Sequence, residues 1–359
     1  MAAMAHTHSM ESIRMVAVGK PLEAQRLPIP TPGEDDVLVQ VRASGICHSD
    51  AHYRAGRSSV EPLPLTLGHE IAGEVVSVGK RVQRLQSGDR VVLHYLITCG
   101  ECEYCQRGAE QYCIKGRMLG HFIDGGYAEY IAVPQRNALN LPPEIPFEQG
   151  ATLMCASATA LHALNKSRLR GGETVAIFGV GGLGISAVQL ARRFGALQVY
   201  AVDTHPAKLE LAARYGAIPI QAAPAGVESP ALDAADQVRA QTGGRGVDVA
   251  IELVGSPGTM RQALRSLAIF GRLVIVGLSA QPLAIDTYRE LLGPEAEIIG
   301  SNDHLLRELP LLIELARRGD LDLSPVVSRT IPLDAAVVNQ ALDELENYGS
   351  AGIRTVITP

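Results

Sequence analysis

The stretch TVAIFGVGGLGISAVQLARRFG, residues 174–195, joins an apolar run, a glycine cluster and an amphipathic segment. Gly179, Gly181 and Gly184 match G-x-G-x-x-G, and Gly182 stands inside the same turn. The chain contains 36 glycines, so the motif gains weight only from its place between a strand-like and a helix-like run. There the first glycine permits a tight turn, the second lets the backbone approach a pyrophosphate, and the third lets helix and strand pack closely. Unpaired N–H groups at the helix start would face the phosphates, so the stretch predicts a dinucleotide site.

Asp203 ends the next strand-like run, YAVD, at about the ~20-residue offset expected for a ribose-binding acid. A carboxylate there accepts hydrogen bonds from the ribose hydroxyls and repels a 2′-phosphate, which favours NAD over NADP. A second interpretation stays open, because Asp203 precedes HPAKLELAA, a typical helix start that it could cap. Lys208, five residues further on, is a candidate cofactor contact, with a solvated helix charge as its alternative.

Strand-like and helix-like segments alternate through the middle of the chain. Runs such as LQVYAVD and RLVIVGLS lack period-2 alternation, which is typical of parallel strands buried on both faces. The pattern predicts an α/β fold, with a doubly wound parallel sheet of Rossmann type over residues 157–300. Residues 1–156 are instead β-rich, with short apolar runs broken by glycine and proline. Residues 301–359 are mostly helical and end in a strand, and we expect this short tail to return to the first domain.

Four of the six cysteines, Cys99, Cys102, Cys105 and Cys113, crowd into CGECEYCQRGAEQYC. Three of them recur at every third position, so a tight turn can point the thiols at one centre. Four thiolates at about 2.3 Å form a closed tetrahedral zinc site. We therefore predict a structural zinc in a lobe over residues 95–115. A redox-active CxxC is the alternative, which two further cysteines in register disfavour.

The other two cysteines lie far apart in the chain. Cys47 stands in GICHSDAH, and GHE, residues 68–70, follows it soon after. A scattered Cys/His/Cys set leaves one coordination position open, which is typical of catalytic zinc. Taken alone, Cys155 in its apolar, helix-like stretch would be interpreted as a core thiol.

Composition narrows the classes of partner. The 359 residues suffice for about two domains. A net charge of -6 without a basic stripe argues against nucleic acid, and no apolar run approaches the ~18 residues of a membrane span. The N-terminal stretch lacks the apolar core of a secretory signal. Cysteines at metal spacing without secretion indicate the cytoplasm.

Together these motifs resemble the zinc-containing medium-chain alcohol dehydrogenases, over nearly the whole chain. Any one motif could arise by chance, but the ordered set is specific. The resemblance implies a GroES-like catalytic domain split between the two ends of the chain, with the Rossmann domain between them. It also implies two zinc ions per subunit and NAD-dependent oxidation of an alcohol to an aldehyde or ketone. The motifs are CHSDAH from Cys47, GHE, the four-cysteine lobe, MCASATAL around Cys155, FGVGGLG, Asp203, and GIRTVI with Arg354.

Matched by motif, the resemblance implies a catalytic zinc held by Cys47, His69 and Cys155. Asp50 resembles the carboxylate that orients the zinc histidine, and Glu70 resembles the glutamate that lies behind the metal.

The remaining matches concern the proton and the cofactor. Ser49 resembles the hydroxyl that takes the alcohol proton, and His52 resembles the outer end of that relay. His48 and Arg354 resemble contacts to the cofactor phosphates, and Tyr95 matches an aromatic position of the substrate pocket. Taken alone, His52 would be an ordinary surface histidine and Tyr95 an ordinary core residue.

Two alternatives stay open. Polyol and threonine dehydrogenases of the same superfamily share GHE but commonly carry glutamate where Cys155 stands, so the cysteine favours simple primary or secondary alcohols. A non-catalytic NAD-binding protein should have lost Cys47, His69 or Ser49, and all three are present. CHSDAH and MCASATAL are more similar to the tetrameric microbial enzymes than to the dimeric animal ones. We therefore expect a homo-oligomer, a tetramer rather than a dimer.

Overall fold

The computed structural model describes residues 9–223, 233–346 and 352–359. The chain divides into two compact units. The first consists of Met1–Cys155, Leu305–Arg317 and Leu323–Pro359, and the second of Ala156–His304 and Arg318–Asp322. The C-terminal segment is thus part of the unit that the N-terminal residues form.

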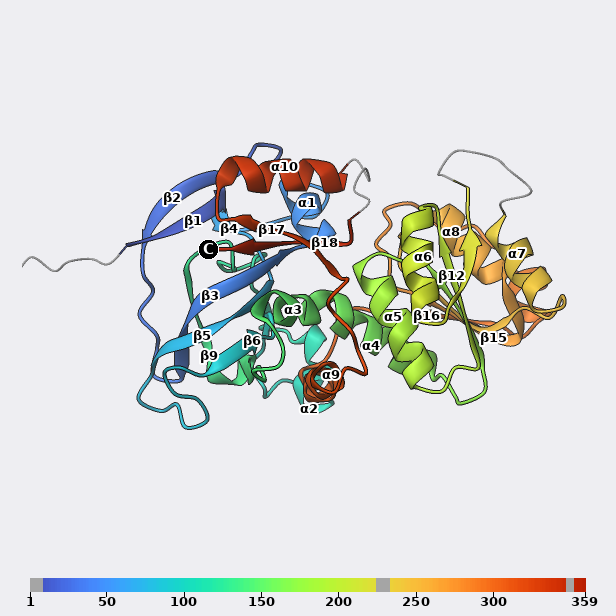
Figure 1. Cartoon of the computed structure of the whole chain (residues 1–359), viewed down its shortest axis with the longest axis horizontal. Coiled ribbons are helices and arrows are strands. Elements are labelled where there is room, and N and C mark those ends of the chain that lie inside the picture. Colours follow the sequence, from blue (N-terminus) through green and yellow to red (C-terminus); the bar gives the residue numbers. More distant parts are fainter. Residues whose placement is uncertain (1–8, 224–232, 347–351) are drawn as a thin grey trace, which may run out of the picture. The chain divides into compact units, whose positions relative to one another are not determined.

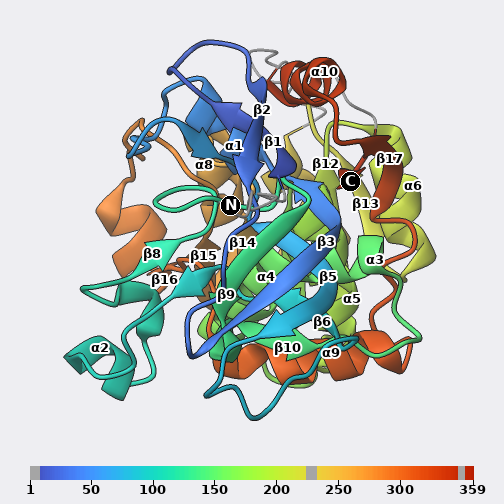
Figure 2. The ribbon, with the colours of Figure 1, turned by 90° about the vertical axis from the view of Figure 1, so that its left-hand side faces the viewer.

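A mixed sheet forms the centre of the first unit. Among the described residues it has seven strands in the order β10-β6-β5-β3-β18-β17, with β9 also paired to β3. Figure 2 shows β3, β5 and β6 side by side. Their bounds are β3 Asp36–Ile46, β5 Glu70–Val78, β6 Arg90–Leu93, β9 Tyr130–Pro134, β10 Ala138–Asn140, β17 Val327–Pro332 and β18 Arg354–Thr358.

Smaller elements complete this unit. A three-stranded sheet has the order β2-β1-β4, and β7 pairs with β8. Helix α1 packs on α10, over an apolar cluster that includes Ile13, Met15, Tyr53 and Tyr127. The bounds are β1 Ser9–Met15, β2 Glu23–Pro28, β4 Leu65–Thr66, β7 Leu96–Ile97, β8 Arg117–Met118, α1 His48–Arg54, α2 Glu103–Gln106, α3 Phe147–Thr152, α9 Leu309–Arg317 and α10 Ala335–Glu346.

The register of β3 brings distant residues together at one end of this sheet. Gly45 lies opposite Glu70 of β5, and Ile46 lies opposite Thr355 of β18. Cys47, the next residue along, therefore lies beside residues that come from both ends of the chain.

The second unit contains a parallel sheet whose described strands have the order β13-β12-β11-β14-β15-β16. The order reverses direction between β11 and β14, which is typical of a doubly wound sheet. The strands are β11 Thr174–Phe178, β12 Gln198–Asp203, β13 Ile218–Gln221, β14 Val247–Glu252, β15 Leu267–Ile275 and β16 Glu297–Gly300.

Helices cover both faces of this sheet (Figure 1). Helix α5 contacts α6 and helix α7 contacts α8. Because crossovers between parallel strands are almost always right-handed, continuation of the chain in opposite directions from β11 puts these two pairs on opposite faces. Helix α4 packs on α5, and α7 packs on α8. These helices are α4 Ala158–Ser167, α5 Gly182–Arg193, α6 Pro206–Arg214, α7 Ala234–Gln241 and α8 Pro257–Arg265. The predicted fold class, a doubly wound parallel sheet with a β-rich domain, is confirmed.

Within the described residues, no helix is both long enough and apolar enough to span a membrane.

Candidate metal centres and cofactor site

The four cysteines of the lobe meet as predicted. Cys99 follows β7, Cys102 precedes α2, Cys105 lies within α2, and Cys113 follows a short turn of helix. All four ligand atoms lie within 4.8 Å of one another. The Sγ–Sγ distances are 3.6 Å for Cys102–Cys105 and 3.5 Å for Cys99–Cys113. Thiolates bound tetrahedrally at about 2.3 Å would be about 3.8 Å apart, so the thiols fit a closed zinc site.

Backbone N–H groups in the lobe favour thiolates. The Cys99 amide points at Cys113 Sγ and the Cys102 amide at Cys99 Sγ, each at 3.3 Å. The backbone amides of Cys105 and Ile114 lower the pKa of Cys102 to about 6. Burial, and then the neighbouring thiol of Cys102, raise the pKa of Cys105 to about 12. Four crowded thiols therefore do not ionise together unless a cation compensates their charge.

A second cluster lies where β3, β5 and the segment after α3 converge. Ligand atoms of Cys47, His69, Glu70 and Cys155 lie within 4.8 Å of one another. The two thiols are 3.7 Å apart, again the edge of a tetrahedral site. Cys47 and Glu70 are placed by the β3–β5 register, and Gly45 leaves room for Glu70, since a Cβ there would lie 2.1 Å from Oε2. The structure therefore brings together residues from three separate parts of the sequence.

Cys155 lies in a break between α3 and α4 rather than in a helix. Met154 is extended, and Cys155 has φ 58° and ψ -73°. A non-glycine residue in this region costs about 1–3 kcal/mol, and such strain clusters at functional sites. The break turns the thiol toward Cys47, which an uninterrupted helix would not do.

The cluster has polar atoms that need a partner. His69 Nε2 and Glu70 Oε2 are buried without a hydrogen bond among the described residues. The Cys47 and Cys155 thiols share a hydrogen bond, which lowers the pKa of Cys47 well below its usual range and raises that of Cys155. The pair thus shares one proton, whereas a divalent cation would let both sulfurs be thiolates. The residues fit zinc, so the chain has two zinc centres.

The carboxylate of Asp50 lies beside the ring of His69. Asp50 Oδ1 lies 3.3 Å from His69 Nδ1, and both side chains are fully buried. Burial lowers the pKa of His69, but the Asp50 carboxylate outweighs it and the pKa is raised well above 6.5. Asp50 is held in turn by the Cys47 amide at 2.8 Å and by the Tyr127 hydroxyl at 3.0 Å. Nε2 is therefore the nitrogen left for a metal.

Glu70 pairs with Arg354. The Arg354 guanidinium lies 3.2 Å from Glu70 Oε1 and donates to the Ile46 carbonyl at 3.1 Å. Burial raises the pKa of Glu70 to about 8, although the charge of Arg354 opposes the shift. The structure thus gives Arg354 contacts at the metal centre, and its predicted cofactor contact stays a prediction.

The other predicted residues of CHSDAH lie on α1. Asp50 accepts from the Cys47 amide in a capping-box arrangement, which explains the three-residue spacing. Ser49 is half-buried and its Oγ is 3.8 Å from Cys47 Sγ. His52 is half-buried, and burial together with the charge of Arg57 lowers its pKa. His48 is exposed at the start of the helix.

Tyr95 lies against the second cluster. Its ring is edge-on to that of His69, with centroids 5.3 Å apart, and it is 3% exposed. It is therefore both a core residue and a neighbour of the metal ligand.

The glycine motif forms the turn between β11 and α5. Gly179 has φ 93°, and α5 begins at Gly182. A Cβ on Gly184 would lie 2.0 Å from the Gly179 carbonyl oxygen, whereas one on Gly181 would meet nothing within 4 Å. Gly184 thus serves packing, and Gly181 leaves open space beside the helix N-terminus.

Asp203 touches this turn from the end of β12. Its carboxylate accepts from the Val180 amide at 2.8 Å and from the His205 amide at 2.9 Å. It therefore joins the glycine turn to the start of α6. The N-cap of α6 is His205, with no side-chain cap hydrogen bond, so Asp203 does not cap this helix, and its ribose contact stays a prediction. Lys208 is half-buried on α6.

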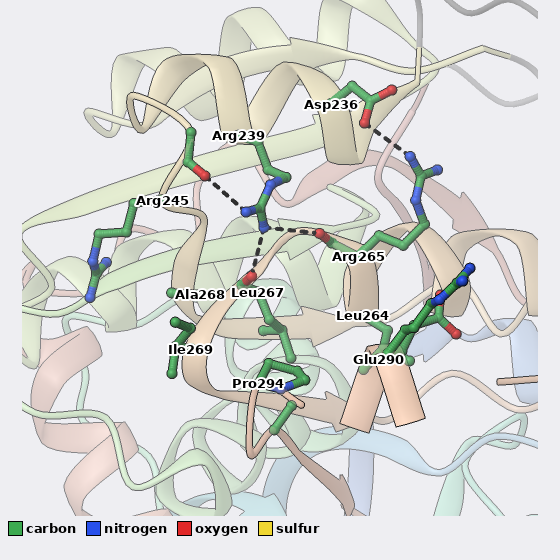
Figure 3. A pocket seen from close by; sticks show the side chains of 13 residues that line it. Asp236, Arg239, Arg245, Leu264, Arg265, Leu267, Ala268, Ile269, Glu290 and Pro294 are labelled. Atoms are coloured by element: carbon green, nitrogen blue, oxygen red, sulfur yellow. Dashed lines mark hydrogen bonds and ion pairs between the residues drawn. The ribbon is translucent and has the colours of Figure 1, made fainter. Parts of the chain in front are cut away.

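A cavity of about 720 Å³ lies elsewhere in the second unit (Figure 3). Arg239 donates to the carbonyls of Leu267 and Gly244 at 2.9 and 2.8 Å, and Arg265 pairs with Asp236 at 2.9 Å. These guanidinium groups already have partners, and no predicted site residue lines the cavity. It is not the dinucleotide site.

Tyr127 was not singled out by sequence reasoning. Burial, and then the Asp50 charge, raise its pKa well above 10, so the hydroxyl stays protonated and donates. The signal available was the glycine pair before it in GGY, since paired glycines indicate close backbone approach.

Comparisons with known proteins agree with this geometry. Residues 33–143 match the alcohol dehydrogenase GroES-like domain family, and residues 182–317 match the zinc-binding dehydrogenase family. A relative named NAD-dependent alcohol dehydrogenase, from Sulfurisphaera tokodaii, is 35% identical over 98% of this chain and 100% of its own length. An S-(hydroxymethyl)glutathione dehydrogenase of Escherichia coli is 32% identical over 95% of this chain and 97% of its own. The crystal structure of AibC aligns with a TM-score of 0.88, at 34% identity, over 99% of this chain and 97% of that one.

The chain belongs to the zinc-binding medium-chain alcohol dehydrogenase family.

Proposed function

We propose that the protein oxidises primary or secondary alcohols to aldehydes or ketones, and catalyses the reverse reduction, with zinc and NAD. The observation that carries this proposal is the convergence of Cys47, His69 and Cys155, whose ligand atoms lie within 4.8 Å of one another and of the Glu70 carboxylate, which pairs with Arg354. A Cys₂His set leaves a fourth position for substrate, in contrast to the closed four-cysteine site.

Zinc at this centre would supply Lewis acidity that favours loss of the alcohol proton, and NAD would accept the hydride. Cys47, His69 and Cys155 would hold the metal. Asp50 fixes the orientation of His69, and the Glu70–Arg354 pair places a carboxylate and its counter-charge beside the ligands. Tyr95 would contribute an aromatic wall beside His69.

Proton removal is assigned to Ser49 and His52. Ser49 Oγ lies beside Cys47 Sγ, and His52 stands one helical turn further along α1. The lowered pKa of His52 leaves its imidazole neutral and able to accept a proton near pH 7. Ser49 would pass the alcohol proton outward, and His52 would deliver it to solvent.

Cofactor binding is assigned to the glycine turn and to Asp203. Gly179, Gly181, Gly182 and Gly184 shape the turn, and the N-terminus of α5 would face the pyrophosphate. The Asp203 carboxylate would bind the ribose hydroxyls, which favours NAD. The first relative, whose name states NAD dependence, supports this choice. Lys208, His48 and Arg354 are further candidate contacts of the cofactor.

We also propose that the protein is a cytoplasmic homo-oligomer, with a tetramer favoured on the similarity of CHSDAH and MCASATAL to tetrameric microbial enzymes. Size-exclusion chromatography with light scattering would test the tetramer.

The deciding experiment measures initial rates with NAD across primary, secondary, aromatic and polyol substrates and S-(hydroxymethyl)glutathione, on protein of known zinc content. We expect the highest kcat/KM for a simple alcohol. A preference for a polyol or for S-(hydroxymethyl)glutathione would replace the substrate assignment. Absence of NAD reduction with every substrate, in protein that holds two zinc ions, would contradict the enzymatic proposal itself.

A further inference from the structure

Residues 125–127, GGY, run alongside the turn that carries His69. Three successive backbone amides donate to this turn: Gly125 to the Thr66 carbonyl at 2.9 Å, Gly126 to Gly68 at 2.8 Å, and Tyr127 to Leu67 at 3.0 Å. On its other side, the Tyr127 carbonyl accepts from the Ile13 amide at 2.8 Å. The segment is therefore fixed on both sides and in turn fixes the backbone just before His69.

The segment and the turn lie so close together that neither Gly125 nor Gly68 has space for a Cβ atom. A Cβ on Gly125 would lie 2.1 Å from the Gly68 carbonyl oxygen, and a Cβ on Gly68 would lie 2.4 Å from Tyr127 Cδ1. Gly68 also has φ 94°, a conformation that favours glycine. The glycine of GHE thus serves two needs, the turn itself and the ring of Tyr127 above it.

The Tyr127 hydroxyl reaches a second component of the same centre. It donates to Asp50 Oδ2 at 3.0 Å, and the Cys47 amide donates to the same oxygen at 2.8 Å. With Oδ2 held by two donors, the plane of the carboxylate is set and Oδ1 faces His69 Nδ1 at 3.3 Å. Tyr127, Asp50 and His69 are all fully buried, so water does not compete for these contacts.

We propose that Tyr127 is a positioning residue of the Cys47–His69–Cys155 centre: its ring and backbone fix the Gly68 turn, and its hydroxyl fixes Asp50, so that His69 presents Nε2. The inference rests on the zinc centre of the proposed function. An ordinary buried tyrosine would contribute packing and one hydrogen bond, and its loss would lower overall stability alone. A positioning residue also changes how tightly one metal, and only that metal, is held. Outer partners of metal ligands typically contribute 10–100-fold to metal affinity.

The test follows zinc release from the full two-zinc protein to a chromophoric chelator. Tyr127→Phe keeps the ring over Gly68 and removes the hydroxyl alone. We expect one of the two release phases to become about 10-fold faster, the lower end of the range for outer partners of ligands. The phase of the four-cysteine lobe, identified as the one missing in Cys102→Ser, should not change. With Co²⁺ in place of zinc, the visible absorption bands of Tyr127→Phe should shift, because the His69 ligand is less constrained.

Tyr200→Phe is the matched control. Tyr200 is also fully buried, but its hydroxyl donates to Gln198 Oε1 at 2.6 Å in the other unit. It should release both metals at the wild-type rates. Asp50→Asn is the second variant, and it should accelerate the same phase by at least as much as Tyr127→Phe. In an Asp50→Ala background the effect of Tyr127→Phe should largely disappear.

Wild-type release rates and cobalt bands in folded Tyr127→Phe would overturn the inference, as would an undiminished effect in the Asp50→Ala background. A wild-type protein that holds only the lobe metal would overturn both the inference and the catalytic centre. Two bound zinc ions without any alcohol oxidation would overturn the proposed function and leave the role of Tyr127 intact.

Discussion

Replacing single glycines of the FGVGGLG turn by alanine separates cofactor binding from packing. Gly181 has an extended backbone with φ -81°, and its Cβ would enter open space. We therefore expect Gly181→Ala to fold normally, with stability unchanged or higher by roughly 0.4–1 kcal/mol through the unfolded chain. The new methyl group would occupy the space proposed for the cofactor pyrophosphate. Loss of one hydrogen bond to a charged group, about 1.5–3 kcal/mol, would weaken NAD binding about 10–100-fold.

Gly184→Ala should behave differently, because its Cβ would lie 2.0 Å from the Gly179 carbonyl oxygen. Strand β11 and helix α5 would have to separate by about 1 Å, and such overpacking typically costs about 1–3 kcal/mol. The melting temperature should fall by roughly 2–12 °C, and NAD binding should also weaken. Calorimetric titration with NAD and thermal unfolding of both variants provide the test. Wild-type NAD affinity in Gly181→Ala, or an unchanged melting temperature in Gly184→Ala, would refute the reasoning.

Four further predictions concern the metal centres, the cofactor, the proton relay and acid stability. Cys102→Ser should reduce zinc from two ions to one per chain and lower the melting temperature by several degrees, because a closed site contributes folding energy; full zinc content by elemental analysis would contradict this. Asp203→Gly with an arginine at the next position should weaken NAD about 10–100-fold and admit NADP; equal use of both cofactors by the wild type would disprove the role of the carboxylate. Ser49→Ala should lower kcat by a factor in the upper part of the 10²–10⁴-fold range that acid–base groups contribute, and His52→Gln should lower kcat by a factor at or below the lower end of that range. Zinc and NAD binding should stay intact in both variants. Wild-type turnover in Ser49→Ala would remove the serine from the mechanism. Burial lowers the pKa of His94 from 6.5 to about 3. The unfolded chain therefore binds the proton first, and the free energy of unfolding falls by up to about 5 kcal/mol as the pH drops from 6.5 to 3. In urea unfolding, the free energy of His94→Gln should depend less steeply on pH, and an unchanged dependence would count against this cause.

Features that depend on neighbouring residues were predicted well from the sequence. The four-cysteine lobe is local, and its thiols meet within 4.8 Å. The Rossmann sheet was also predictable, because apolar strand runs and the glycine turn each lie within short stretches. The position of Asp203 at the end of β12, with its carboxylate on the Val180 amide, agrees with the spacing argument.

Features that depend on pairing between residues far apart in the chain could not be predicted from the sequence. Cys155 stands in an apolar stretch that predicts a helix, but the helical backbone is interrupted there, with φ 58° at Cys155. Hydrophobic periodicity does not report such a break. The contact of Arg354 with Glu70 depends on β18 pairing with β3, and the contact of Tyr127 with Asp50 depends on a tertiary hydrogen bond. Neither partner is indicated by the residues next to it in the sequence.

The pairing of β18 with β3 has a consequence for the order of events during synthesis. Arg354 reaches the Ile46 carbonyl across 308 positions of the chain. The ribosome produces Cys47 and His69 early, yet Glu70 acquires its counter-charge only when residue 354 has emerged. Most of the second unit is one continuous segment, so its parallel sheet can form while the first unit still lacks β17 and β18. Domains generally fold as units during synthesis, and here the nucleotide-binding sheet would therefore mature before the catalytic metal centre does. Until then, all three proposed zinc ligands have emerged, but Glu70 beside them still lacks the charge of Arg354.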